Sequence, residues 1–241
     1  YGATTFNYDQ RLELKTSFSG KDKLLTRLRT GNFTKGGNAF GGSGVNLTAL
    51  DVATDSAGGG GANNNVIVDR LYYKFPVGKE FTVIAGAVAR NTESIALWPS
   101  KYNKGGAKIL DWTALMGTSG VYNKETGQLV GAYWQQKVKK GDNNFSVSVN
   151  YVADDKDGND SSAGFMTSNS EASLLAQLGY GGPRWGLAFG YRYGQCDSGN
   201  GLRRGTSFVK DSKWNNECKD ANGKRTGSST NSYALNAYWA P

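Results

Sequence analysis

Residues 7–18 read NYDQRLELKTSF and show the clearest alternation of apolar and polar residues in the chain. Its even positions carry Tyr8, Leu12, Leu14 and Phe18. Its odd positions are all polar or charged: Asn7, Asp9, Arg11, Glu13, Lys15 and Ser17. Because successive side chains of a strand point to opposite faces, this alternation predicts a β-strand with one apolar and one charged face.

The same alternation recurs along the whole chain in segments of about ten residues, as in the strands of a transmembrane barrel. We predict nine strands, near residues 7–18, 24–30, 66–75, 81–90, 129–138, 144–151, 171–180, 185–193 and 233–239. The apolar phase of these strands includes Leu12, Leu14, Leu28, Val147, Leu174 and Leu187. The segment 81–90 is apolar on both faces, so its facing stays open.

The connections between the predicted strands alternate in length. Tight turns follow the odd-numbered strands, and long polar stretches near 34–63, 91–128, 154–169 and 194–229 follow the even-numbered ones. Outer-membrane barrels have short periplasmic turns and long external loops. The pattern therefore favours an all-β, transmembrane antiparallel β-barrel.

Aromatic residues gather at the predicted strand ends. One end collects Phe18, Phe75, Phe81, Phe145, Tyr180, Trp185 and Trp239, and the other collects Tyr8, Tyr151, Tyr193 and Tyr233. Amphipathic rings favour the two membrane interfaces. We interpret these sets as two girdles, although strands favour aromatic residues in any case.

Composition excludes several function classes. The chain has no histidine, which removes Ser-His and Cys-His catalysis and the commonest ligand of zinc, iron and copper. We expect no enzyme activity, no metal site and no cofactor. Its mean hydropathy is −0.53 and its apolar runs are only a few residues long, so the sequence holds no membrane-spanning helix. The net charge of +8 is spread along the strands rather than clustered, so we predict no nucleic-acid binding.

Ionisable residues fall in the polar phase of the strands. Side chains of this kind are costly on a lipid face and tolerated in a wet lumen. We therefore predict a pore lining made of Arg11, Glu13, Lys15, Arg27, Arg29, Arg70, Lys74, Lys137, Glu171 and Arg192. Rings of Arg and Lys select anions, whereas simple solvation of a lumen gives no selectivity. Acidic and basic residues on neighbouring strands, such as Glu13 and Arg27, also have the option of pairing.

Two loops carry further candidates. The 91–128 loop, with Trp98 and Trp112, is either a constriction folded into the lumen or an ordinary external loop. Cys196 and Cys218 lie in one polar segment, which indicates a disulfide in an oxidising compartment, with two free thiols as the alternative.

Three segments carry a family resemblance: 24–33 (LLTRLRTGNF), 70–78 (RLYYKFPVG) and 238–241 (YWAP). They resemble the cyanobacterial outer-membrane porins of the iron-uptake group, within the carbohydrate-selective porin family. The resemblance implies that residues 1–241 form about nine strands of a larger barrel of about 16 strands. It also implies an N-terminal S-layer-homology domain that binds peptidoglycan, outside this chain.

The strand pattern predicts an outer-membrane porin, and the resemblance implies a cyanobacterial one. The resemblance also implies passive passage of inorganic ions, including iron, and of small hydrophilic solutes such as carbohydrates. The expected partners are outer-membrane lipid, peptidoglycan and further copies in a homotrimer. One alternative is a secreted β-sandwich carbohydrate-binding module, which would need mixed loop lengths and buried inward faces. Another is a barrel enzyme or a gated receptor, and the receptor would need a plug domain.

Overall fold

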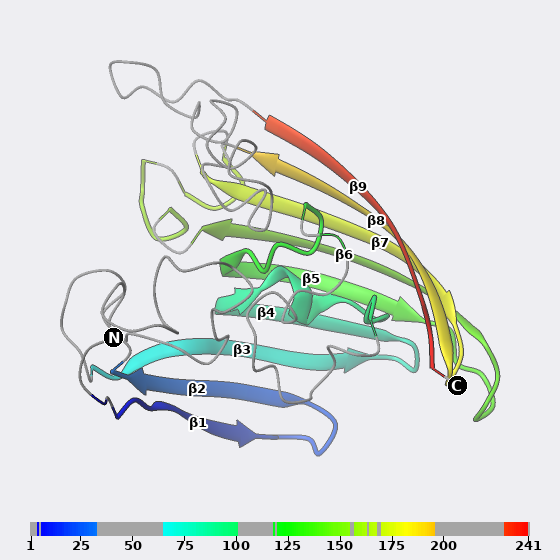
Figure 1. Cartoon of the computed structure of the whole chain (residues 1–241), viewed down its shortest axis with the longest axis horizontal. Coiled ribbons are helices and arrows are strands. Elements are labelled where there is room, and N and C mark those ends of the chain that lie inside the picture. Colours follow the sequence, from blue (N-terminus) through cyan, green and yellow to red (C-terminus); the bar gives the residue numbers. More distant parts are fainter. Residues whose placement is uncertain are drawn as a thin grey trace.

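The chain folds into one antiparallel sheet of nine strands, arranged in sequence order (Figure 1). The computed structural model describes residues 4, 6–32, 65–100, 118, 120–154, 157–162, 164–167, 170–195 and 229–240. The strands are β1 (Asp9–Thr16), β2 (Lys23–Gly31), β3 (Ile67–Val77), β4 (Phe81–Arg90), β5 (Thr126–Gln135), β6 (Asn144–Asp154), β7 (Ala172–Gly181), β8 (Trp185–Gln195) and β9 (Ser229–Trp239). A 3-10 turn, η1 (Asn91–Ser94), follows β4. The sheet is curved and open, with β1 and β9 at its edges.

The predicted nine strands and the alternation of connections are confirmed. Turns of three to eight residues follow β1, β3, β5 and β7, and connections of 17 to 35 residues follow β2, β4, β6 and β8. Among the described residues there is no helix long and apolar enough to cross a membrane.

The predicted position of the fifth strand is wrong by about three residues. β5 begins at Thr126, which pairs with Arg90, and ends at Gln135, so Lys137 lies in the turn that follows. The cause is Glu80, whose carboxylate accepts the backbone N–H of Lys137 at 2.8 Å and the indole N–H of Trp134 at 2.8 Å. These bonds hold the pKa of the Glu80 carboxyl below its ordinary value.

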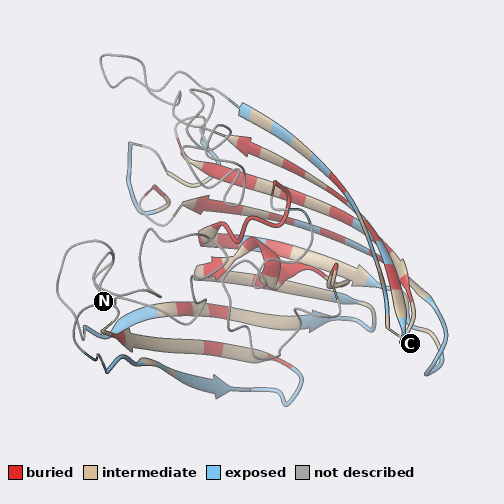
Figure 2. Cartoon of the chain, in the orientation of Figure 1, coloured by how far each residue is buried: buried red, intermediate tan, exposed pale blue. Residues whose placement is uncertain are grey.

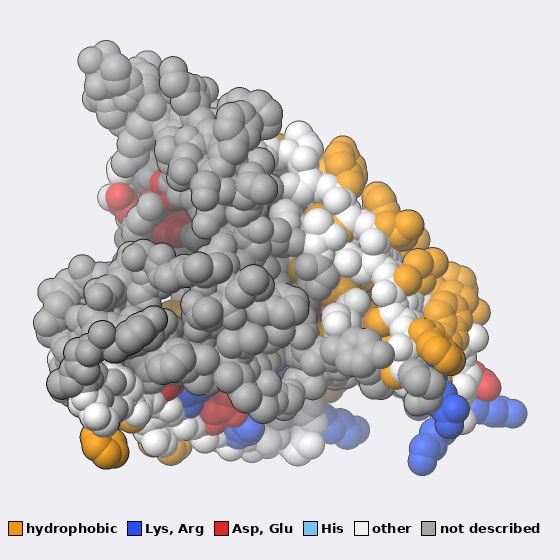
Figure 3. Space-filling view, viewed as in Figure 1, with side chains coloured by type: hydrophobic (Ala, Val, Ile, Leu, Met, Phe, Trp, Pro, Cys, Tyr) orange, Lys and Arg blue, Asp and Glu red, His pale blue; other side chains and the backbone are white. Residues whose placement is uncertain are grey.

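The two faces of the sheet differ in chemistry, and the apolar one is the exposed one. Residues opposite each other in register share a face, and the alternating phases hold throughout β5–β9. The apolar face exposes Leu12, Leu14, Val77, Phe81, Val130, Phe145, Val147, Val149, Leu178, Leu187, Phe189, Tyr233, Leu235 and Trp239. Figure 3 shows such side chains in a band along the outer edge of the sheet.

The opposite, polar face is covered over its central strands. It buries Ser146, Ser148, Asn150, Ser173, Gln177 and Arg192. Figure 2 shows the buried positions concentrated in β4–β8 and in the segment that crosses them, while β1 is largely exposed. Soluble proteins bury apolar side chains and expose polar ones, so this sheet has the reverse distribution.

The facing of β4, which its sequence leaves open, follows from its pairing. Ile84 lies opposite Lys74 and therefore points to the polar face, whereas Val83 lies opposite Phe75 on the apolar face. Ile84 is fully buried there in a small apolar cluster. The other members of this cluster are Leu25, Tyr72, Ala89, Leu129 and Val152.

Aromatic rings on the apolar face line up at both ends of the strands. At the short-turn end, Tyr180 stacks on Phe145 at 4.4 Å and meets Trp185 edge-on at 5.4 Å. Toward the long-loop end, Tyr151 of β6 meets Phe165 of the following connection edge-on at 4.8 Å. The predicted gathering of rings at the short-turn end is confirmed, whereas Tyr233, predicted at the opposite end, lies one pair from the middle of the β8–β9 ladder.

The turn between β1 and β2 is fastened by one carboxylate. Asp22 accepts hydrogen bonds from the Ser17 hydroxyl and from the backbone N–H of Phe18. It also accepts from the hydroxyl and the backbone N–H of Ser19, and from the Tyr73 hydroxyl at 2.6 Å. These donors, the hydroxyls of Ser19 and Tyr73 first, hold the pKa of Asp22 well below its ordinary value of 3.8.

We predict that Asp22→Ala lowers the melting temperature at pH 7, because five donors lose their acceptor. A carboxyl with a lowered pKa stabilises the folded state fully above 3.8 and loses this effect as the pH falls below it. The difference in melting temperature between wild type and variant should therefore shrink between pH 5 and pH 2. Circular dichroism melts check this, with Asp142→Ala in an exposed turn as the control. A difference that is constant with pH would contradict the assignment.

Candidate functional site

A charged wall occupies the polar face of β1, β2 and β3. Glu13 lies opposite Arg27, and Arg11 lies opposite Arg29. Arg27 in turn lies opposite Arg70 on β3. The structure thus brings together seven of the predicted pore-lining residues: Arg11, Glu13, Lys15, Arg27, Arg29, Arg70 and Lys74.

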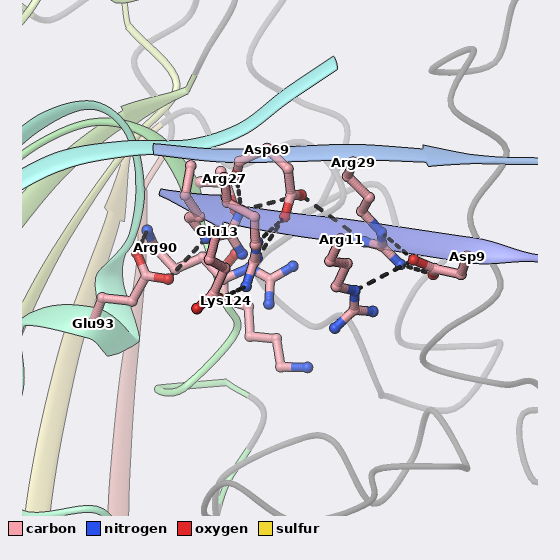
Figure 4. A network of polar contacts seen from close by, with 11 residues as sticks. Asp9, Arg11, Glu13, Arg27, Arg29, Asp69, Arg90, Glu93 and Lys124 are labelled. Atoms are coloured by element: carbon pink, nitrogen blue, oxygen red, sulfur yellow. Dashed lines mark hydrogen bonds and ion pairs between the residues drawn. The ribbon is translucent and has the colours of Figure 1, made fainter. Parts of the chain in front are cut away.

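Every arginine of this wall is bound to carboxylates (Figure 4). Asp9 binds Arg29 and also Arg11, the latter at 3.3 Å. Asp69 binds Arg27 at 2.5 Å. The pairing of Glu13 with Arg27, which the sequence left as an option, is present at 3.5 Å between Oε1 and Nη1. The positive charge of the four arginines is therefore compensated locally.

Three acidic members of the wall were not among the predicted pore-lining residues: Asp9, which the alternation does place on the polar face, and Asp69 and Glu93, which it does not. Asp69 lies at a β-bulge, where the register between β2 and β3 shifts next to Arg27. Since a bulge inserts an extra residue, Asp69 and Arg70 both reach the polar face, and strict alternation cannot predict this. Glu93 comes from η1, and its Oε1 lies 2.8 Å from Nε of Arg70.

The connection between β4 and β5 folds back onto the polar face. The side chain of Asn150 donates to the carbonyl of Asn91 at 2.8 Å, and the Ser148 hydroxyl accepts from the N–H of Ala96 at 2.9 Å. Further along, Arg192 Nε donates to the carbonyl of Gly120 at 2.6 Å. The described parts of this connection are thus docked on β6 and β8. This position on the polar face agrees with a segment folded inward, and its role as a constriction stays a prediction.

Glycines make room for this docked segment. A Cβ atom on Gly131 would lie 2.3 Å from the Ser94 hydroxyl oxygen, and one on Gly179 would lie 2.9 Å from side-chain carbons of Leu97. On Gly190 it would lie 2.8 Å from Tyr122. Since real Cβ contacts do not come this close, the polar face is shaped to fit the segment.

The remaining predicted residues lie apart from the charged wall. Arg192 is fully buried beneath the docked segment. Glu171 directly precedes β7 at the long-loop end, and Lys137 lies in the β5–β6 turn. Cys196, Cys218 and Trp112 lie outside the described residues. The described residues contain no cluster of His, Cys, Asp and Glu that could hold a metal ion.

Comparison with known proteins finds two relatives, both uncharacterized. The chain is 30% identical over 265 residues to a protein from Nostoc sp. (strain PCC 7120), covering 99% of this chain and 41% of the relative. It is 29% identical over 202 residues to a protein from Synechocystis sp. (strain PCC 6803), covering 82% of this chain and 33% of the relative. The chain therefore spans less than half the length of these relatives. No family model and no solved structure matches it.

We predict that Gly131→Val displaces the docked segment, because its side chain would collide with Ser94 and Asn150. Overpacking of this kind costs about 1–3 kcal/mol. Limited proteolysis should then cut the 91–125 connection faster than in the wild type. Ala132→Val, on the opposite face of the same strand, is the matched control. Equal cleavage rates for the two variants would show that the segment does not depend on this contact.

Proposed function

We propose that this chain is part of an outer-membrane β-barrel porin that lets ions and small hydrophilic solutes pass through a water-filled lumen. The main support for this proposal is that the apolar face of the sheet is exposed while much of the polar face is buried. A contiguous exposed apolar surface marks a membrane or an interaction site. Here that surface extends from Leu12 on β1 to Leu235 on β9.

Strand length and aromatic placement support the same proposal. The strands have 8 to 11 residues, close to the about 9–11 that a tilted strand needs to cross a bilayer. Stacked rings such as Phe145 and Tyr180 lie at one end of the apolar face, and Tyr151 and Phe165 meet toward the other. Rings in these places suit the two interfaces of a membrane.

The open edges of the sheet also fit a part of a larger barrel. Unpaired backbone groups cannot be tolerated in the hydrocarbon core, so only closed barrels span it with strands. β1 and β9 have no further partner among the described strands. The relatives are more than twice as long as the aligned region, which leaves length for strands that would close the barrel. The 16 strands, the peptidoglycan-binding domain and the trimer implied by the resemblance belong to this proposal, as does the cyanobacterial outer membrane.

In such a barrel the polar face lines the lumen, and the docked connection narrows it. The docked segment lies against β4–β8, and the charged wall of β1–β3 lies beside it. Glu93 joins the two, because it belongs to η1 and binds Arg70. Solutes would pass along this wall, whose more exposed side chains are Arg11, Glu13 and Lys15.

The β-sandwich alternative receives less support. A sandwich packs the apolar faces of two sheets against each other. The described strands form a single sheet, and its apolar face is exposed.

Planar-bilayer recordings test the proposed function directly. The full-length protein, refolded in detergent and added to a lipid bilayer, should give stepwise increases in conductance in KCl. Protein that folds, as judged by altered gel mobility before and after heating, yet never conducts would contradict the channel.

We predict that Leu14→Lys weakens insertion into liposomes, because it places a charge on the apolar face, where Leu14 is 51% exposed. The expected cost is about 2–4 kcal/mol near the bilayer midplane. Lys15→Leu, one position away on the polar face, is the matched control and should insert normally. Urea titrations of liposome-inserted protein measure both, and equal destabilisation would contradict the assignment of the faces.

We also predict that selectivity follows the balance of the charged wall. Because each arginine is paired, the wild type should show only a weak anion preference, largest at low salt, where screening is weakest. Asp69→Asn should strengthen that preference, since Asp69 contacts Arg27, Arg29 and Arg70. Arg27→Gln should shift it toward cations.

Reversal potentials in a KCl gradient measure these shifts. Lys139→Gln, in an exposed turn, should leave the potential unchanged. Shifts of the same sign for Asp69→Asn and Arg27→Gln would exclude the wall from ion selection.

A further inference from the structure

Two lysines stand directly opposite each other on the polar face. Lys23 of β2 and Lys74 of β3 are register partners near the short-turn end. Nζ of Lys23 lies 5.5 Å from the ring centroid of Tyr72, and Nζ of Lys74 lies 4.8 Å from that of Tyr133. Both lysines are half-buried. Like charges placed directly opposite in a sheet are destabilising, so this arrangement needs an explanation.

The arginines of the charged wall differ from these two lysines in their partners. There each arginine has a carboxylate in contact, but among the described residues neither Lys23 nor Lys74 forms an ion pair. The closest acidic side chains along the wall are already engaged. Glu13 binds Lys15 at 2.8 Å, and Glu93 binds Arg70 at 2.8 Å. Within the described part of the chain, the lysine pair therefore has no counter-charge of the kind that the same face supplies to its arginines.

The lysine pair borders a cavity of about 280 Å³. Its lining residues are Lys21, Lys23, Lys74, Phe75, Pro76 and Thr82. This volume holds a small oxyanion together with several waters, since one water occupies about 30 Å³. Each ammonium group has three N–H donors, and an aromatic ring covers only one side of it. Donors thus remain for a ligand between the two lysines.

We propose that Lys23 and Lys74, with Lys21 at the rim, bind a small oxyanion of the phosphate or carboxylate type at the short-turn end of the polar face. The anion accepts hydrogen bonds from both ammonium groups and removes their mutual repulsion. Thr82 lies in the same cavity and offers a hydroxyl donor. This inference rests on the proposed lumen and names a solute class for it.

Binding to the folded, full-length protein in detergent tests the site. Inorganic phosphate, titrated by isothermal calorimetry at low ionic strength, should bind saturably. Lys23→Gln and Lys74→Gln should each weaken binding by about tenfold, the loss expected for one charge-assisted hydrogen bond. Lys79→Gln and Lys139→Gln, exposed lysines in turns at the same end, should leave it unchanged. Acetate, titrated in parallel, shows whether a carboxylate competes or whether the site prefers a tetrahedral oxyanion.

The outcomes separate this inference from the channel itself. A protein that conducts but binds neither phosphate nor acetate saturably would overturn the site alone, and so would two glutamine variants that bind as tightly as the wild type. A protein that binds phosphate but never conducts would contradict the channel and support the site. Lys23→Arg and Lys74→Arg, which keep the charge, should retain binding and serve as variants if the glutamine forms do not fold.

Discussion

Successive side chains of a β-strand point to opposite faces of the sheet, and in this protein that geometric rule separates two kinds of chemistry. Leu14 and Val147 are exposed on one face, while Ser148 and Asn150 are buried on the other. A one-residue slip in register would exchange the faces of a whole strand. The register is therefore the constraint on which the rings at the strand ends, the charged wall and the contacts of the docked segment with the polar face all depend.

Burial of the polar face creates a second requirement, because buried polar groups need partners. The connection between β4 and β5 meets part of it, through bonds such as those from Asn150 to Asn91 and from Gln177 to Tyr122. On β1 and β2, and beside the segment on β3, carboxylates and arginines satisfy one another. Glu93 belongs to the docked segment and binds the buried Arg70 of β3, so the docked segment and the charged wall form one network. A substitution in the docked segment should therefore alter the ion pairs of the wall, and a substitution in the wall should alter the docking of the segment.

The sequence predicts much of this fold because its signals are local. Alternation places all nine strands, and loop lengths order them in a meander. Prediction from alternation fails where contacts between strands determine which face a residue points to or where a strand ends. The bulge that brings Asp69 beside Arg27 breaks strict alternation, and the capture of the Lys137 amide by Glu80 ends β5 early. The facing of β4 is visible only through its pairing with β3. No local pattern indicates that the docked segment packs closely against Gly131 and Gly179, because this contact involves residues distant in sequence.

In the proposed barrel, the apolar face meets lipid and the polar face meets water. Single cysteines at positions 11–15, introduced with Cys196 and Cys218 replaced by serine, test it in liposome-inserted protein. A water-soluble thiol reagent should label the positions of Arg11, Glu13 and Lys15 and spare those of Leu12 and Leu14, which only a lipid-soluble reagent should reach. If the water-soluble reagent labels the cysteine at position 14 but not the one at position 15, or labels all five positions equally, the assignment of the two faces is wrong.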